Sequence, residues 1–164
     1  TTSVAADQQI LAGSEYLAHI YDTVAGHPRI DLKIEAKVQS KLLSLIGKGL
    51  IRSAHDCSDG GLLTAIAESC ILGRIGFKGA EILFSQIRQG RWDAALFGEK
   101  ASQIVISVAP EALDLVVTEV GEQEVPYMIL GVAEGAHLVI PGLVDESIDA
   151  LGHAFEHGLM NSQA

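Results

Sequence analysis

The segment at residues 55–61, with the sequence HDCSDGG, holds side chains that could bind a nucleotide or a metal ion. It lies between a predicted strand, residues 50–56, and a predicted helix, residues 62–72. Backbone amides at the start of a helix point outward, and the helix dipole favours an anion there. Asp56 could hold a hard cation such as magnesium, which prefers oxygen ligands. Ser58 could donate a hydrogen bond to a phosphate oxygen.

The same segment also has a purely structural interpretation. Ser58 or Asp59 could cap the helix, and Gly60 and Gly61 could be turn residues. Two carboxylates, Asp56 and Asp59, also repel phosphate unless a metal ion lies between them. The residues alone therefore leave a ligand site and a capped turn both open.

Size, composition and charge limit the class of protein. The chain has 164 residues, of which 48% are hydrophobic and 20% charged, values that suit one globular domain with its own core. The net charge of -10 disfavours a nucleic-acid partner. No apolar run approaches the roughly 20 residues that cross a bilayer, so no membrane partner is expected. Cys57 and Cys70 are expected to be free thiols of a cytoplasmic protein.

Hydrophobic periodicity and breaking residues predict the elements around this segment. The helices are expected at 14–24, at 31–48 with Asp31 as cap, at 62–72, at 110–120, and after Asp145, which caps a last helix with Phe155 on its inner face. The strands are expected at 50–56, 80–84 and 102–108, and in a hairpin of 126–133 and 137–140. This mixture predicts an α/β layered sandwich, a mixed sheet flanked by helices, with helix 31–48 packed on the sheet that contains 102–108.

Other residues could do chemistry, but their patterns favour structural roles. His153 and His157 lie four residues apart and could share a metal ion, yet no third ligand is evident in the sequence. An exposed polar helix face is therefore the expected interpretation. Cys57 lies near a helix start, where thiolates can be favoured, but no partner base is within sequence reach.

Four segments of the chain resemble one enzyme family. The stretch SAHDCSDGGLL at 53–63 resembles the S-A-H-D-x-S-D-G-G-L of phosphoribosylformylglycinamidine synthases. LAGSEYL at 11–17, LFGEKASQIVISV at 96–108 and GVAEGAHLVI at 131–140 are similar to further motifs of that family, in the same order. The chain thus resembles the family's C-terminal domain, of the type related to aminoimidazole ribonucleotide (AIR) synthase.

The resemblance implies a role in purine biosynthesis. The family converts formylglycinamide ribonucleotide, ATP and glutamine-derived ammonia to formylglycinamidine ribonucleotide, ADP and phosphate, as an ATP-dependent C–N ligase that uses magnesium. Residues 1–164 are expected to be a single domain of a larger cytoplasmic enzyme, with residues 1–10 as remnant of a linker. Its expected partners are the N-terminal domains, a glutaminase subunit or domain, and a small accessory subunit. The chain alone is expected to be inactive and to self-associate.

The resemblance also implies roles for single residues. Ser58, Gly60 and Gly61 match nucleotide-binding positions and Asp56 a magnesium position, while Glu99 and Ser102 lie on a loop implied to face substrate. No catalytic residue is expected within this chain. Gln103 departs from the family's usual arginine, which weakens the assignment of that loop to phosphate. Two alternatives stay open: another ATP-dependent enzyme of the AIR synthase superfamily, and a structural domain or auxiliary nucleotide site.

Overall fold

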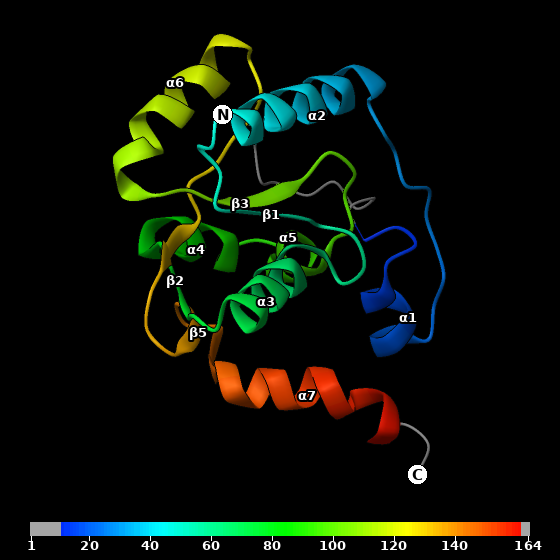
Figure 1. Cartoon of the computed structure of the whole chain (residues 1–164). Helices are drawn as coiled ribbons and strands as arrows, with labels where there is room; N and C mark the ends of the chain where they lie inside the picture. The colour runs from blue at the N-terminus through cyan, green and yellow to red at the C-terminus, as the bar shows by residue number, and fades with distance from the viewer. Residues whose placement is uncertain (1–10, 162–164) are drawn as a thin grey trace. The chain divides into compact units, whose positions relative to one another are not determined.

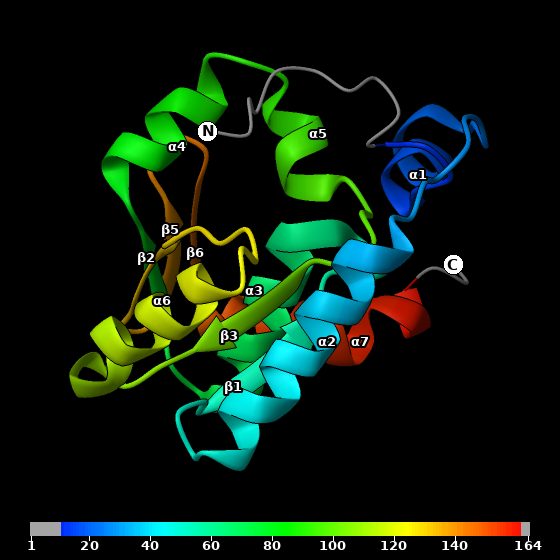
Figure 2. The same ribbon diagram turned by 90° about the horizontal axis from the view of Figure 1, so that it is seen from above.

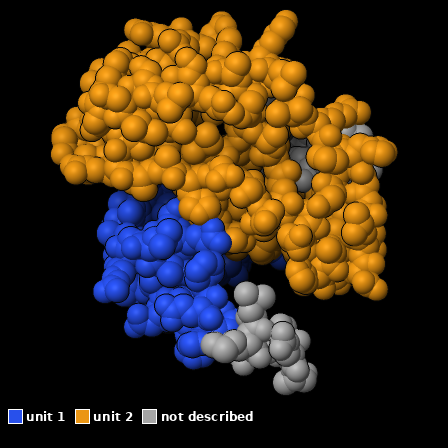
Figure 3. Space-filling model, turned by 45° about the vertical axis from the view of Figure 1, so that its right-hand side comes forward, with its two compact units in different colours: residues 1–5, 66–92, 129–164 blue, residues 6–65, 93–128 orange. Residues whose placement is uncertain are grey.

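The computed structural model describes residues 11–161, and the chain forms two compact units that alternate along the sequence (Figure 3). Of the described residues, unit 1 comprises 66–92 and 129–161, and unit 2 comprises 11–65 and 93–128. The expected linker remnant at residues 1–10 lies outside the described residues. The expectation of one domain over 1–164 stays a prediction.

The elements of each unit come from separate parts of the sequence (Figure 1). Unit 2 holds α1 (Glu15–Tyr21), α2 (Leu32–Gly47), β1 (Ser53–Asp56), α5 (Trp92–Phe97, apart from its first residue), β3 (Ile104–Ser107), the 3-10 turn η1 (Pro110–Ala112) and α6 (Leu113–Glu122). Unit 1 holds β2 (Phe77–Gly79), α4 (Glu81–Arg88), β4 (Gly131–Ala133), β5 (His137–Ile140), β6 (Val144–Ser147) and α7 (Ile148–Asn161). Helix α3 (Gly61–Gly73) begins in unit 2 and continues in unit 1.

Unit 2 is built on the antiparallel pair of β1 and β3, with α2 and α6 packed beside it (Figures 1 and 2). Leu45 of α2 is buried with two valines of α6, and Ile106 and Val108 pack against this cluster. The predicted packing of helix 31–48 on the strand within 102–108 is therefore confirmed. Asp31 also caps α2 as predicted, because its carboxylate accepts from the amides of the second and third helical residues.

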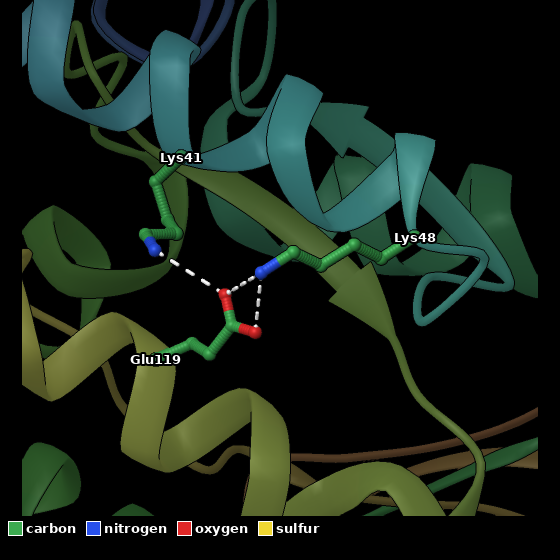
Figure 4. Close-up of polar contacts among 3 residues, drawn as sticks. All are labelled: Lys41, Lys48 and Glu119. Atoms are coloured by element: carbon green, nitrogen blue, oxygen red, sulfur yellow. Dashed lines mark hydrogen bonds and ion pairs between the residues drawn. The ribbon is translucent and has the colours of Figure 1, made fainter.

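A buried lysine joins α2 to α6 (Figure 4). The side chain of Lys41 is only 7% exposed, and its Nζ lies 3.4 Å from Glu119 Oε2. Lys48 Nζ donates to both carboxylate oxygens of Glu119, at 2.6 and 2.7 Å, and its side chain is half exposed. Glu119 therefore supplies the counter-charge that a nearly buried ammonium needs.

Replacing Glu119 by glutamine is expected to lower the melting temperature by roughly 5 °C or more near neutral pH, because Lys41 is left buried without a counter-charge. Hydrogen bonds from Lys48 lower the pKa of the Glu119 carboxyl. A carboxyl with a lowered pKa in the folded state adds stability above its unfolded pKa and loses it as the pH falls. The difference between wild type and E119Q should therefore begin to narrow as the pH falls to about 4.5 and close only below the lowered pKa of the folded state.

Thermal melts from neutral to acidic pH measure this difference. Lys48→Met is the matched control, because it leaves the pair of Lys41 and Glu119 in place and should cost less. A difference between wild type and E119Q that stays constant down to acidic pH would contradict the assignment.

Unit 1 contains a four-stranded mixed sheet with strand order β4-β2-β5-β6. Strands β2 and β5 are parallel, and the other two pairs are antiparallel. Phe84 of α4 is fully buried, as are Leu138 and Ile140 of β5. A Cβ at Gly79 would lie 2.6 Å from the Phe84 ring, so glycine there leaves room for the aromatic side chain. The predicted α/β class, with a mixed sheet flanked by helices, is confirmed.

The expected strand at 80–84 and the expected hairpin of 126–133 with 137–140 are wrong. Residues 80–84 begin helix α4 instead of forming a strand, because Phe84 and Ile87 form a buried face at helical spacing. Of the expected strand 126–133, only Gly131–Ala133 forms a strand, β4. Strand β2 lies between β4 and β5 in the sheet, so β4 and β5 form no hairpin.

The expected start of the last helix is also wrong. Asp145 lies within β6 and does not cap α7. The Ser147 hydroxyl instead accepts from the amide of Ala150 at 3.1 Å. Phe155 is 60% exposed rather than packed on an inner face.

Large apolar side chains remain exposed on both units, among them Val24, Leu72 and Ile82. Exposed apolar surface of this kind favours association with other protein surfaces. The self-association expected from the sequence stays a prediction. Within residues 11–161, no helix combines the length and apolar character that a bilayer span requires.

Candidate functional site

Four of the predicted site residues line one hollow of about 430 Å³ in unit 2. They are Asp56, Ser58, Glu99 and Ser102. The hollow is completed by Ile30, Glu35, Gln39, Cys57, Asp59, Lys100, Ala101, Gln103 and Ile104. Gly60 and Gly61 follow directly in the chain and do not line it.

The pairing of β1 with β3 brings two of the motifs together. Asp56 ends β1 and pairs with Ile104 at the start of β3. The amide of Cys57 donates to the carbonyl of Gln103 at 3.0 Å, so the pairing continues one residue beyond the strands. Because the strands are antiparallel, the end of β1 and the loop before β3 meet at the same place. This register places the 56–58 segment beside the 102–104 segment.

The two glycines form a turn that packs against the chain's own backbone. Both have positive φ, 78° at Gly60 and 72° at Gly61. The amide of Gly61 donates to the Ser58 carbonyl at 2.9 Å. A Cβ at Gly61 would lie 2.8 Å from the Gly98 carbonyl oxygen and 2.8 Å from the Phe97 carbonyl carbon. The lack of a side chain at Gly61 thus allows the backbone of residues 97–98 to lie close to it.

Glu99 binds the amide of the glycine turn. Its Oε1 accepts from the backbone amide of Gly60 at 2.9 Å and from that of Glu15, the first residue of α1, at 2.8 Å. Gly60 was predicted as a nucleotide-binding residue, and its amide is paired within the chain. The role of Glu15 was missed, although it lies within the LAGSEYL motif.

The second wall of the hollow comes from α2. The Ser102 hydroxyl donates to Glu35, and the side-chain amide of Gln39 donates to the same carboxylate. Ser102 has a φ of 66°, which turns the loop before β3. Sequence reasoning missed Glu35 and Gln39. Their spacing of four residues, which places both side chains on one face of α2, was the available signal.

The charged side chains that line the hollow are mainly acidic. Glu35, Asp56, Asp59 and Glu99 contribute carboxylates, and Lys100 is the lysine among the lining residues. In the part of the chain that the structure describes, no group of three or more His, Cys, Asp or Glu side chains is arranged to hold a metal ion. These residues therefore do not fit magnesium by themselves, because this ion demands a near-octahedral set of oxygen ligands.

The cysteines and histidines that could do chemistry are buried or contact other groups of the chain. Cys57 and Cys70 are buried free thiols, as expected. Burial, followed by the charge of Asp56, raises the pKa of the Cys57 thiol to about 11, so little thiolate forms near neutral pH. His153 and His157 approach each other with ring centroids 4.5 Å apart. His55 forms a hydrogen bond through Nδ1 with the Asp56 carbonyl oxygen at 2.8 Å, directly before the 57–61 turn.

The chain is similar to known proteins over most of its length. The family model for the AIR synthase related protein, C-terminal domain, matches residues 2–141. Phosphoribosylformylglycinamidine synthase subunit PurL of Thermomicrobium roseum is 41% identical over 154 residues, which are 93% of this chain and 21% of that protein. The same subunit of Caldanaerobacter subterraneus subsp. tengcongensis is 43% identical over 131 residues, 79% of this chain and 17% of that protein. The chain thus spans about a fifth of these relatives.

Solved structures share the fold. The structure of PurLQS from Thermotoga maritima matches 86% of this chain and 24% of its own, with a TM-score of 0.63 and 14% identity. T. maritima PurL complexed with FGAR matches 72% of this chain and 21% of its own, with a TM-score of 0.61 and 13% identity. T. maritima PurL complexed with ATP matches 71% and 21%, with a TM-score of 0.56 and 14% identity. The resemblance indicated by the motifs is confirmed.

Proposed function

We propose that this chain is part of a phosphoribosylformylglycinamidine synthase. The chain belongs to the family of the AIR synthase related protein, C-terminal domain. The whole protein would convert formylglycinamide ribonucleotide, ATP and glutamine-derived ammonia to formylglycinamidine ribonucleotide, ADP and phosphate. In this reaction it would act as a C–N ligase of purine biosynthesis, in the cytoplasm.

The identity of 41% over 93% of the chain carries this proposal. The geometry of unit 2 supports it, because segments from three of the four resembling motifs lie together around the hollow and the glycine turn. Within the proposal, Asp56 and Ser58 face the nucleotide and its metal, and Glu99 and Ser102 belong to the loop on the substrate side. Gly60 and Gly61 form the turn that places the nucleotide-facing residues.

The cofactors and partners follow from the same proposal. The nucleotide is ATP or ADP. Magnesium, which supplies charge neutralisation for phosphoryl transfer, would take Asp56 as one ligand and its remaining ligands from outside this chain. The partners are the N-terminal domains of the protein, a glutaminase subunit or domain, and a small accessory subunit.

A domain exchange tests the proposal. The segment of Thermomicrobium roseum PurL that matches this chain is replaced by residues 1–164, and the purified chimera is given formylglycinamide ribonucleotide, ATP and ammonia. We expect formation of formylglycinamidine ribonucleotide and ADP. A chimera that melts cooperatively like the parent enzyme but forms no product would contradict the proposal.

A structural role within the same enzyme is the second candidate. It is favoured by the lack of a metal-ligand group among the described residues and by the pairing of the Gly60 amide with Glu99. Asp56→Asn in the chimera separates the two candidates. The substitution should weaken nucleotide binding if Asp56 serves the ligand, and should leave it unchanged if the domain is structural. Asp145→Asn is the matched control, because Asp145 lies on β6, far from the hollow in the sequence.

A further inference from the structure

One carboxylate joins three separate segments of unit 2. Glu99 follows α5, Gly60 precedes α3, and Glu15 begins α1, yet the Oε1 atom of Glu99 accepts from the backbone amides of the other two. These partners are 84 and 39 residues away in the sequence. The amide of Glu15 has no acceptor within α1, because the first amides of a helix have none, and Gly60 precedes the first residue of α3. Glu99 thus satisfies two donors that the local backbone leaves unpaired.

The same short segment, residues 97–99, holds both neighbours by other contacts. The Phe97 ring stacks on the Tyr16 ring of α1, with centroids 4.8 Å apart and an angle of 9° between the planes. The backbone of Phe97 and Gly98 lies so close to Gly61 that a Cβ there would overlap it. The carboxylate of Glu99 is therefore one of several links by which residues 97–99 fix α1 and the glycine turn.

We propose that Glu99 is a positioning residue whose carboxylate is an internal anion, held jointly by the first turn of α1 and by the glycine turn. It fixes the edge of the hollow, because Glu99 also lines that space. In this arrangement the Gly60 amide serves the chain's own carboxylate and not a nucleotide phosphate. The inference concerns the conformation of this chain and goes beyond the proposed function.

Charge and geometry decide what a substitution does. A hydrogen bond from an amide to a carboxylate is stronger than one to a neutral oxygen. Glutamine keeps an acceptor oxygen in the same position and loses only the charge, while alanine removes the acceptor. Both amides should therefore stay largely paired in E99Q and become unpaired in E99A.

Hydrogen exchange of single amides, measured by NMR on the 164-residue chain, tests the proposal. In E99A the amides of Glu15 and Gly60 should exchange at least about tenfold faster than in the wild type, as expected for loss of a charge-assisted bond. In E99Q both should stay closer to the wild type than to E99A. The matched control E111A, an exposed glutamate of η1 in the same unit, should leave both amides unchanged.

The amides of Arg52 and Cys57 report on the folding of the strand pair, because they donate to Ser107 and Gln103. Unchanged exchange of Glu15 and Gly60 in E99A, with these two amides protected, would overturn the proposal. If E99A unfolds, E99Q decides: faster exchange of both amides in a folded E99Q supports the proposal, because only the charge is lost, and exchange equal to that of the wild type overturns it. No nucleotide enters the measurement, so its failure is distinct from failure of the proposed function.

Discussion

Replacing Gly61 by alanine is expected to lower the free energy of unfolding by about 4 kcal/mol. Two costs add. A residue with a side chain pays about 1–2 kcal/mol for the left-handed conformation, and Gly61 has a φ of 72°. The added Cβ would also lie 2.8–3.0 Å from backbone atoms of Phe97 and Gly98. Backbone cannot rotate away as a side chain can, so residues 97–99 must move and their links to α1 weaken.

Gly49→Ala is the control that separates these two costs. Gly49 has a φ of 70°, almost the same as Gly61, but no atom lies within 4 Å of its Cβ position. It should therefore cost only the conformational part, about 1–2 kcal/mol. Urea denaturation of both variants at equal pH and temperature measures the difference. Equal losses for the two variants would show that residues 97–98 do not press on the turn.

The sequence predicted those parts of the fold whose signals are local. The cap at Asp31 and the apolar stripe through Leu45 are local signals, and they were enough to predict helix α2. Residues 80–84 carry two competing signals: Ile82 and Phe84 alternate as in a strand, but Phe84 and Ile87 have helical spacing. Burial of both Phe84 and Ile87, with the Phe84 ring beside Gly79 of β2, decides for the helix. Strand β2 lies between β4 and β5 in the sheet, although it is distant from both in the sequence. The residues of the turn between β4 and β5 give no signal of this arrangement.

The site was predicted in part for the same reason. Asp56 and Ser58 are neighbours in the sequence, whereas Glu99 and Ser102 were named only from the family resemblance, and the pairing of β1 with β3 that brings Ser102 close to Asp56 was not predicted. The bond between Glu99 and Glu15 links residues 84 positions apart and follows no periodicity. The glycines were interpreted through the ligand that they could admit. The structure shows a second reason for Gly61, which is the close approach of residues 97–98.

The 164-residue chain alone is expected to turn over no ATP and to bind Mg-ADP weakly. Among the residues described, Asp56 has no partners arranged with it as a set of metal ligands. One carboxylate does not hold magnesium against water, because the ion keeps a near-octahedral shell of oxygens. Without the ion, the carboxylates that line the hollow repel the phosphates. The amide of Gly60 cannot offset this repulsion while it donates to Glu99.

Thermal melts of the isolated chain with Mg-ADP measure this weakness directly. A ligand that binds only the folded state stabilises it by RT ln(1 + [L]/Kd), so a Kd near 1 mM gives only about 0.4 kcal/mol at 1 mM ligand. The expected rise in melting temperature is therefore no more than about 3 °C. The chimera with the Thermomicrobium roseum enzyme is the positive control, because the proposed function assigns the remaining ligands of the ion to the other domains. A rise of about 10 °C for the isolated chain, or measurable ADP release from ATP, would mean that the hollow holds the metal-nucleotide complex without those domains.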